Sequence, residues 1–111
     1  MMMKTRVRGP HPIREASIWA PSGPGAYILT RDGRLAHYVG RSVELRRRIP
    51  QSAAYGAGYR SFLYAEASSE RNAYLIECEW FHEFEPPDNS LHPAVPSNTY
   101  WRCPITGCPW S

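Results

Sequence analysis

Residues 24–40 read PGAYILTRDGRLAHYVG, and this stretch decides the fold. Two apolar runs flank an Asp-Gly pair, which between such runs is the strongest short-range signal for a tight β-hairpin. If Asp-Gly forms a two-residue loop, counting outward pairs Tyr27 with Tyr38 and Gly25 with Gly40. The tyrosines then share one face, beside glycines that leave the backbone open to a close approach. The same pattern is typical of a purely structural aromatic pair.

The other elements are read outward from this hairpin. A helix is predicted from Ser42, as its N-cap, to Pro50, with Leu45 facing the sheet and Arg48 at the edge of the buried face. We expect a loop at 51–58, a strand at 59–67, a helix from about 69 to 85, and before the hairpin an irregular arm with a short helix at 12–19.

Composition limits the class of protein. The chain has 111 residues, enough for one small domain, and 42% of them are apolar. No run is long and apolar enough to cross a membrane, and the N-terminus lacks the apolar core of a signal peptide, so we expect a cytoplasmic protein.

The net charge is +3, and arginines gather in or beside the hairpin, at positions 31, 34, 41, 46, 47 and 48. Clustered arginine attracts phosphate, although a solvated face explains any single run.

One carboxylate on the long helix is out of place. At helical spacing, one stripe carries the apolar residues Ala73, Tyr74, Ile76, Trp80, Phe81 and Phe84. Glu77 lies inside this stripe. A carboxylate among aromatic neighbours is costly unless it is protonated, paired or bound to a metal. Glu77 is therefore expected to have an arginine or a divalent cation as its partner.

The ordered set Gly25-Ala26-Tyr27, Tyr38-Val39-Gly40, Arg48, Glu77 and Asn89 resembles the GIY-YIG nuclease domain, in its small standalone bacterial or phage type. That family includes homing endonucleases and the incision subunit of bacterial excision repair. The similarity covers about residues 25–89. It implies an α+β fold, with a three-stranded antiparallel sheet flanked by helices, and metal-dependent cleavage of DNA.

The resemblance also implies residue roles. Tyr27 and Tyr38 would be the motif tyrosines, one of them acting as or assisting the general base. Arg48 would hold the scissile phosphate with help from Arg41, and Glu77 would bind magnesium or manganese. In-line displacement at phosphorus needs a positioned water and positive charge on the phosphoryl oxygens, which this set supplies.

One position departs from the family. Many members carry His or Tyr one helical turn after the motif arginine, where this chain has Ser52.

The rival interpretation is a nucleic-acid-binding module that keeps the fold without cutting, and a weaker one is an enzyme acting on another phosphate ester. A compact domain without a separate recognition module is expected to depend for specificity on DNA shape, a homodimer or a protein partner. Asn89 is expected to be structural.

The three cysteines predict a second kind of site. Cys78 and His82 are one helical turn apart, and the tail carries Cys103 and Cys108. In a reducing compartment these residues favour a tetrahedral zinc site over disulfides, with His92 as an alternative fourth ligand. Buried free thiols are the other interpretation.

The expected organisation is an N-terminal arm (1–23), a nuclease-like domain (24–90) and a Pro/Cys-rich tail (91–111) packed on it, held by structural zinc if the site forms.

Overall fold

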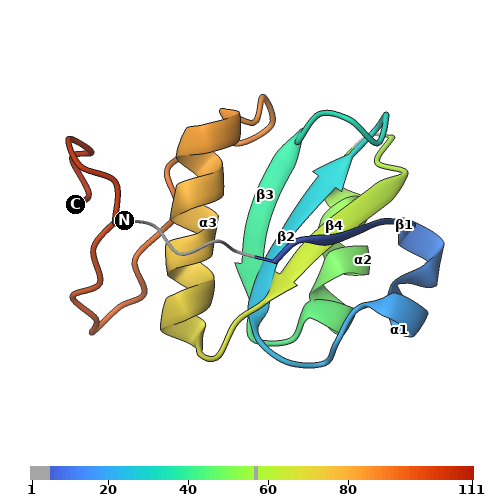
Figure 1. The fold of residues 1–111 in the computed structure, drawn as a ribbon, viewed down its shortest axis with the longest axis horizontal. Helices are drawn as coiled ribbons and strands as arrows, with labels where there is room; N and C mark the ends of the chain where they lie inside the picture. Colours follow the sequence, from blue (N-terminus) through green and yellow to red (C-terminus); the bar gives the residue numbers. More distant parts are fainter. Residues whose placement is uncertain (1–5, 57) are drawn as a thin grey trace.

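The computed structural model describes residues 6–56 and 58–111. Within this part of the chain, four strands form one antiparallel sheet in the order β1-β4-β2-β3 (Figure 1). The elements in chain order are β1 (Arg8–Pro12), η1 (Ile13–Glu15), α1 (Ala16–Trp19), β2 (Gly25–Thr30), β3 (Tyr38–Ser42), α2 (Leu45–Tyr55), β4 (Ser61–Glu66) and α3 (Glu70–Phe84). The predicted α+β class is confirmed, with four strands where three were expected.

Each face of the sheet is covered by helices. Alternate residues of a strand point to opposite faces. Tyr27 and Leu29 of β2 pack with α1 and α2, where Leu45 and Ile49 are fully buried. The intervening residues of β2 pack on α3 around Trp80. Figure 1 shows α3 on one side of the sheet and α1 and α2 on the other.

The extra strand lies in the segment expected to be an irregular arm. Arg8–Pro12 pairs antiparallel with β4, and the predicted helix at 12–19 is divided into η1 and α1. The sequence of β1 is RGPHP, which has no alternation and two prolines. An edge strand tolerates proline at positions where the backbone nitrogen faces solvent, because no hydrogen bond to the neighbouring strand is lost there. Residues 1–5 of the arm lie outside the described residues.

The hairpin register differs from the prediction by two residues. Tyr27 pairs with Gly40 and Leu29 with Tyr38, so residues 31–37 form the connection instead of a two-residue turn. A shift of one residue would reverse the faces, but a shift of two preserves them. The two tyrosines therefore still share one face, as diagonal neighbours.

Side chains inside the connection explain this longer loop. The Asp32 carboxylate accepts hydrogen bonds from the backbone N–H groups of Arg34 (2.8 Å) and Leu35 (3.0 Å). The Thr30 hydroxyl accepts one from the N–H of Gly33 (3.0 Å). Asp and Thr side chains form such local turns in competition with the strand ladder. The Asp-Gly pair therefore correctly predicted where the chain reverses direction, but the connection is longer than the two residues expected.

Helix α2 extends past the proline that was expected to end it. Pro50 lies inside the helix, which runs on to Tyr55, and Ser42 ends β3 rather than capping α2. Proline removes one N–H bond from the ladder, but the Ala-containing segment that follows favours the helix and Ser52 is buried against the sheet. As a result Ser52 stays one turn beyond Arg48 on the same side of α2.

Helix α3 begins and ends close to the prediction, but it is buried on two sides. Ser69 caps its N-terminus by accepting a hydrogen bond from the Asn72 N–H. Ile76, Trp80 and Phe81 of the predicted stripe pack on the sheet, whereas Tyr74 lies on the tail side and Phe84 is exposed. Cys78 is fully buried because the tail covers its side of α3 in a third apolar cluster, which includes Tyr74 and the tail cysteines.

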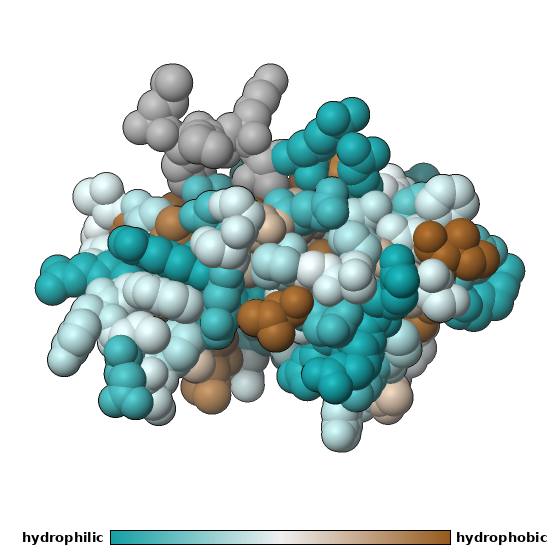
Figure 2. Space-filling view, turned by 90° about the horizontal axis from the view of Figure 1, so that it is seen from below, coloured by the Kyte–Doolittle hydropathy of each residue, from teal (hydrophilic) through white to brown (hydrophobic). Residues whose placement is uncertain are grey.

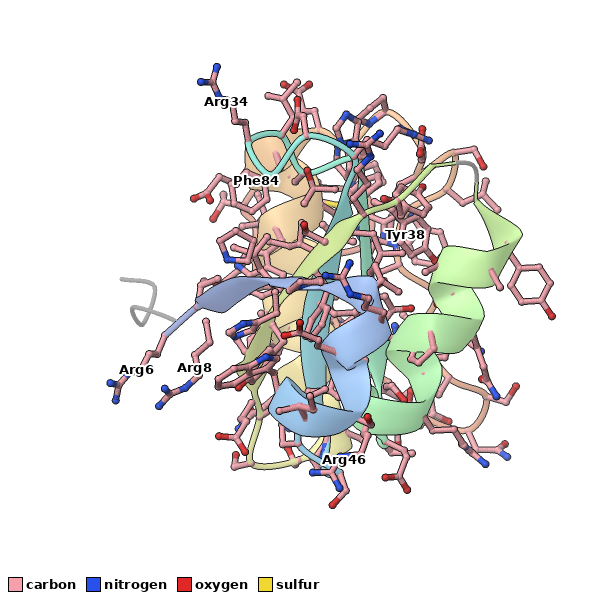
Figure 3. The ribbon with its side chains drawn as sticks, turned by 90° about the vertical axis from the view of Figure 1, so that its right-hand side faces the viewer. Arg6, Arg8, Arg34, Tyr38, Arg46 and Phe84 are labelled. Atoms are coloured by element: carbon pink, nitrogen blue, oxygen red, sulfur yellow. The ribbon has the colours of Figure 1, made fainter. Side chains whose placement is uncertain are left out.

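Arginines project from several sides of the molecule. Figure 3 labels Arg6 and Arg8 beside β1, Arg34 at the hairpin loop and Arg46 on α2. The Nε atom of Arg46 donates to the Ala20 carbonyl (2.8 Å), so Arg46 joins α2 to the end of α1. The arginines that lie close together in sequence do not form a single basic face.

The surface is polar with small apolar areas. On the face shown in Figure 2, hydrophilic side chains surround separate hydrophobic patches. Among the described residues, the helices are all too short or too polar to span a bilayer.

Candidate functional site

The two motif tyrosines lie on the α2 side of the sheet. Their ring centroids are 6.3 Å apart, and Figure 3 shows Tyr38 between the sheet and α2. The Tyr27 ring lies across Gly40, where a Cβ atom would come within 2.6 Å of the Tyr27 hydroxyl. The space expected beside paired glycines is thus filled by Tyr27 itself. Only glycine at position 40 allows this hydroxyl to reach the edge strand.

Helix α2 contributes two polar side chains to this region. The Tyr27 hydroxyl and the Ser52 hydroxyl are 2.5 Å apart in a buried hydrogen bond. Arg48, one turn earlier, lines the cavities on both sides of Tyr38. Ser52 is therefore a direct partner of the motif tyrosine.

Burial favours the neutral phenol form of both tyrosines in the free protein. It raises the pKa of Tyr27, and the Ser52 hydrogen bond and the Arg48 guanidinium oppose the rise. It also raises the pKa of Tyr38, with the negative charge of Glu77 adding to the effect and Arg48 opposing it. Both phenols are protonated at neutral pH.

Glu77 has the arginine partner that the sequence required. Its side chain is buried on α3, and its Oε1 atom accepts from Arg41 Nη1 at 2.7 Å. The Arg41 guanidinium lies over the Tyr74 ring, 5.1 Å from its centroid, and its Nη2 atom donates to the Ala94 carbonyl (2.7 Å). Burial raises the pKa of Glu77, and the hydrogen bond and charge of Arg41 oppose that rise.

These groups meet in one cavity of about 350 Å³. Its lining includes all the residues with expected catalytic or phosphate-binding roles: Tyr27, Tyr38, Arg41, Arg48 and Glu77. Sequence reasoning missed Glu70, a second carboxylate in this lining, which is two helical turns before Glu77 on α3. That spacing of seven residues was the available signal.

A second cavity of about 400 Å³ shares Tyr38 and Arg48 with the first. Its other walls include Tyr55, which is 90% exposed, and Tyr59. Tyr59 hydrogen-bonds to Asp88 and lies under the Arg31 guanidinium at 4.7 Å. The two cavities together give a polar and aromatic surface that continues on both sides of Arg48.

Asn89 has the structural contacts expected of it. Its Oδ1 atom accepts from the Val39 N–H (2.8 Å), and its Nδ2 atom donates to the Val39 carbonyl (3.0 Å). The amide thereby pairs with the backbone of edge strand β3 as another strand would. This contact holds the residues after α3 against the strand that carries Tyr38.

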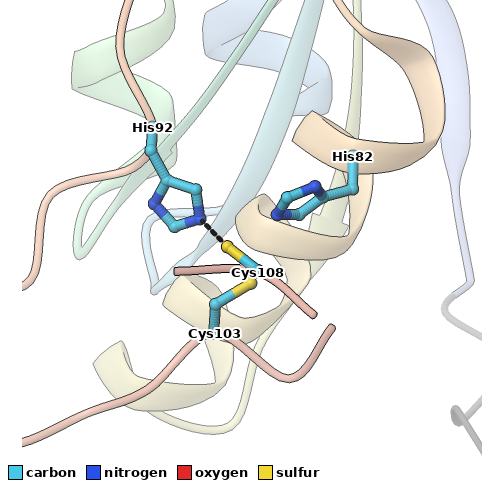
Figure 4. Close-up of side chains that lie close together, drawn as sticks. All are labelled: His82, His92, Cys103 and Cys108. Carbon is cyan, nitrogen blue, oxygen red and sulfur yellow. Dashed lines mark hydrogen bonds between the residues drawn. The ribbon is translucent and has the colours of Figure 1, made fainter. Parts of the chain in front are cut away.

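The tail brings a separate set of metal-ligand types together on the other side of α3. One ligand atom from each of His82, His92, Cys103 and Cys108 lies within 4.8 Å of the others (Figure 4). This set contains His92, the alternative ligand, in place of Cys78. Cys78 packs beneath the set, in the apolar cluster with Tyr74.

The sheet and its flanking helices correspond to a known class of fold, that of the GIY-YIG endonuclease domain, so the resemblance seen in the sequence is confirmed at the level of the fold. The crystal structure of the GIY-YIG N-terminal endonuclease domain of UvrC from Thermotoga maritima, bound to its catalytic magnesium, has a TM-score of 0.60 and 24% identity, covering 69% of this chain and 94% of that one. A tyrosine-to-phenylalanine variant of that domain gives a TM-score of 0.59 at 23% identity, covering 71% and 96%.

Sequence comparison points in the same direction. UvrABC system protein C of Caldicellulosiruptor saccharolyticus is 27% identical over 81 residues, which cover 64% of this chain and 14% of that protein. The chain thus spans only a small part of the length of that relative. No protein-family model matches the chain.

Proposed function

We propose that this protein is a metal-dependent endonuclease that hydrolyses DNA phosphodiester bonds. The observation that carries the proposal is the single cavity in which two tyrosines, two arginines and a buried glutamate meet. The fold shared with the UvrC endonuclease domain supports the same chemistry. DNA is the proposed substrate because arginine side chains in the cavity attract phosphate. DNA shape, a second copy of the chain or a protein partner would supply specificity.

The residues present fit a divalent cation such as magnesium or manganese. Magnesium binds through one or two carboxylates and completes its coordination with water and substrate phosphate oxygens. Glu77 would hold the cation, and Glu70 lines the same cavity. The pairing of Glu77 with Arg41 already places a cation against this carboxylate. When bound, a divalent ion polarises a phosphoryl oxygen and stabilises the leaving alkoxide.

The protein side chains would perform the remaining steps. Arg48 would hold the scissile phosphate between the two cavities, and Arg41 would turn from Glu77 to the phosphate as substrate enters. Tyr27 would position the attacking water and accept its proton. Because burial raises its pKa, Tyr27 needs nearby positive charge and the Ser52 hydrogen bond to act as a base near neutral pH.

Two observations favour a second candidate, a nucleic-acid-binding module that does not cut. Arg41 forms an ion pair with Glu77, the carboxylate that would bind the metal. Ser52 lies at the position where many family members have His or Tyr. Such a module would bind DNA through arginines with strong salt dependence and would leave it intact.

Cleavage assays separate the two candidates. Supercoiled plasmid and branched or single-stranded DNA are incubated with magnesium, with manganese, or with chelator. We expect cleavage only with a metal, and a loss of about a hundredfold to a thousandfold in rate for Glu77→Ala or Tyr27→Phe. Salt-dependent binding without cleavage under every metal condition would instead identify the non-cutting module.

Matched variants test whether the effect is local. Glu83→Ala removes an exposed carboxylate from the same helix as Glu77, and Arg47→Ala removes an exposed arginine beside Arg48. Both controls should retain nearly full activity, whereas Arg48→Ala should not. An active, metal-dependent Glu77→Ala protein would remove the proposed mechanism.

A further inference from the structure

The geometry points to a structural zinc site, independent of the proposed nuclease activity, that fastens the C-terminal tail to α3. Its ligands are His82 from the helix, His92 from the segment after it, and Cys103 and Cys108 from the tail (Figure 4). Two imidazoles and two thiolates form one of the usual tetrahedral donor sets for Zn²⁺. Cys78 is outside this set and acts as a packing residue below it.

The spacing of the donor atoms suits zinc. In a tetrahedron with Zn–S near 2.3 Å and Zn–N near 2.0 Å, neighbouring donors are about 3.3 to 3.8 Å apart. The His92 Nε2 and Cys108 Sγ atoms are already 3.4 Å apart, and all four donors lie within 4.8 Å of one another. Small side-chain rotations therefore suffice to complete the tetrahedron.

One donor atom points to a ligand independently of the spacing. The Nε2 atom of His82 is buried and has no hydrogen-bond partner among the described residues. An unpaired buried nitrogen is costly, and native structures rarely contain one without a reason. A metal bond at this nitrogen supplies the reason.

The surroundings orient the other ligands as metal sites usually do. His92 Nδ1 lies 2.9 Å from the Pro93 carbonyl, so the tautomer with a proton on Nδ1 donates there and leaves Nε2 for the metal. The His92 ring stacks on Trp110 at 5.2 Å, and the Trp110 N–H donates to Cys108 Sγ at 3.4 Å. Backbone N–H groups aimed at cysteine sulfur stabilise the thiolate that zinc requires.

The zinc site also lies close to the candidate active site along the chain. His92 is two residues before Ala94, whose carbonyl accepts a hydrogen bond from Arg41. Arg41 in turn pairs with Glu77. Zinc would therefore hold the segment that orients Arg41, and it would have a structural role with no contact to substrate.

The first test measures metal in the full-length protein purified without a metal-affinity column. We expect about one zinc per chain, with X-ray absorption giving two sulfur and two nitrogen donors at about 2.3 and 2.0 Å. Zinc far below one per chain would overturn the site. Three sulfurs and one nitrogen would overturn this ligand set. Neither measurement depends on nuclease activity or on a variant that must fold.

Variants then separate the ligands from their neighbours. His92→Gln and Cys108→Ser should each lose most of the zinc, whereas Cys78→Ala should keep it although Cys78 is fully buried in the adjoining cluster. Loss of zinc in Cys78→Ala together with retention in His92→Gln would reverse the assignment. Cobalt substitution of the wild-type protein should give the strong visible absorption of a tetrahedral thiolate site.

Discussion

Helix α3 carries Glu77 and His82, which both have buried polar atoms, and the two side chains differ in what those atoms contact. Glu77 faces the sheet, where Arg41 binds its carboxylate at 2.7 Å. His82 faces the tail, and its buried Nε2 atom has no partner among the described side chains and backbone groups. A buried charge must be compensated for the chain to fold, which explains the arginine beside Glu77. An unpaired ring nitrogen costs less than an unpaired buried charge, and this nitrogen can bind a metal ion.

The difference teaches where an exogenous cation is needed. At Glu77 the protein supplies a cation of its own, so a divalent ion would have to displace or share with Arg41. At His82 the neighbouring donors are a histidine and two cysteines, which are side chains that attract a metal ion. The zinc is therefore expected to be permanent and the catalytic metal exchangeable.

The largest effect should follow from removing the partner of Glu77. Arg41→Met leaves a buried carboxylate alone, and the loss of its charged hydrogen bond should lower the free energy of unfolding by about 3 kcal/mol, measured by urea denaturation. Burial alone then raises the pKa of Glu77 further. Because a raised folded-state pKa stabilises the protein below its unfolded value, the defect should shrink as the pH falls toward 4.5, the ordinary value.

A double variant controls for lost packing. Arg41→Met with Glu77→Met removes both charges and keeps their aliphatic parts, so it should recover most of the stability. Magnesium should also stabilise the Arg41→Met protein more than the wild type, if Glu77 binds the ion. An equal loss of stability relative to the wild type at pH 7 and at pH 4.5 would contradict the role given to this ion pair.

A smaller change is expected when His82 no longer needs a partner. Phenylalanine fills similar space without a buried nitrogen. If His82 binds zinc, His82→Phe should lower the melting temperature by several degrees in zinc-loaded protein but should equal or exceed the wild type in chelator. A variant more stable than the wild type under both conditions would make His82 a packing residue only.

The sequence pointed to most residues of the candidate active site, either through local patterns or through the family resemblance, but it did not point to Glu70. Glu77 lay in an apolar stripe, and the hairpin placed two tyrosines on one face. The structure gathers these residues with Arg48 around one cavity. The hairpin register was wrong by two residues, but the prediction that the tyrosines share one face still held, because a shift of two residues leaves each side chain on the same face.

Contacts between distant segments were the part that the sequence did not reveal. The pairing of Arg41 with Glu77 and the meeting of His92 with Cys108 depend on how the tail packs on α3. Edge strand β1 was missed because its prolines hide the pattern of a strand. The extension of α2 beyond Pro50 was missed because burial of the following turn outweighs one lost backbone hydrogen bond.

Tyr27 is an intermediate case between Glu77 and His82, since its buried hydroxyl has the neutral partner Ser52. The Ser52 hydrogen bond lowers the pKa of Tyr27, so the loss of this bond, worth about 1 kcal/mol, raises that pKa further. Ser52→Ala should therefore shift the alkaline rise of the cleavage rate to higher pH and reduce the rate about fivefold at neutral pH. Tyr100→Phe, on a side chain that is 94% exposed, should leave the profile unchanged. An unshifted profile in Ser52→Ala would exclude Tyr27 as the base.

The smallest effect is expected at Asp32, an exposed carboxylate that accepts hydrogen bonds from backbone N–H groups. Hydrogen bonds from Leu35 and Arg34 lower the pKa of Asp32 from 3.8 to about 2. A lowered folded-state pKa stabilises the protein above the unfolded value, and this stability is lost as the pH falls from about 4 to about 2. Asp32→Asn keeps an acceptor oxygen without a titrating charge, so the stability of this variant should depend less on pH in that window and should stay close to that of the wild type near pH 7. Equal acid dependence of both proteins in urea denaturation would mean that Asp32 does not hold the loop, and the longer hairpin connection would need another cause.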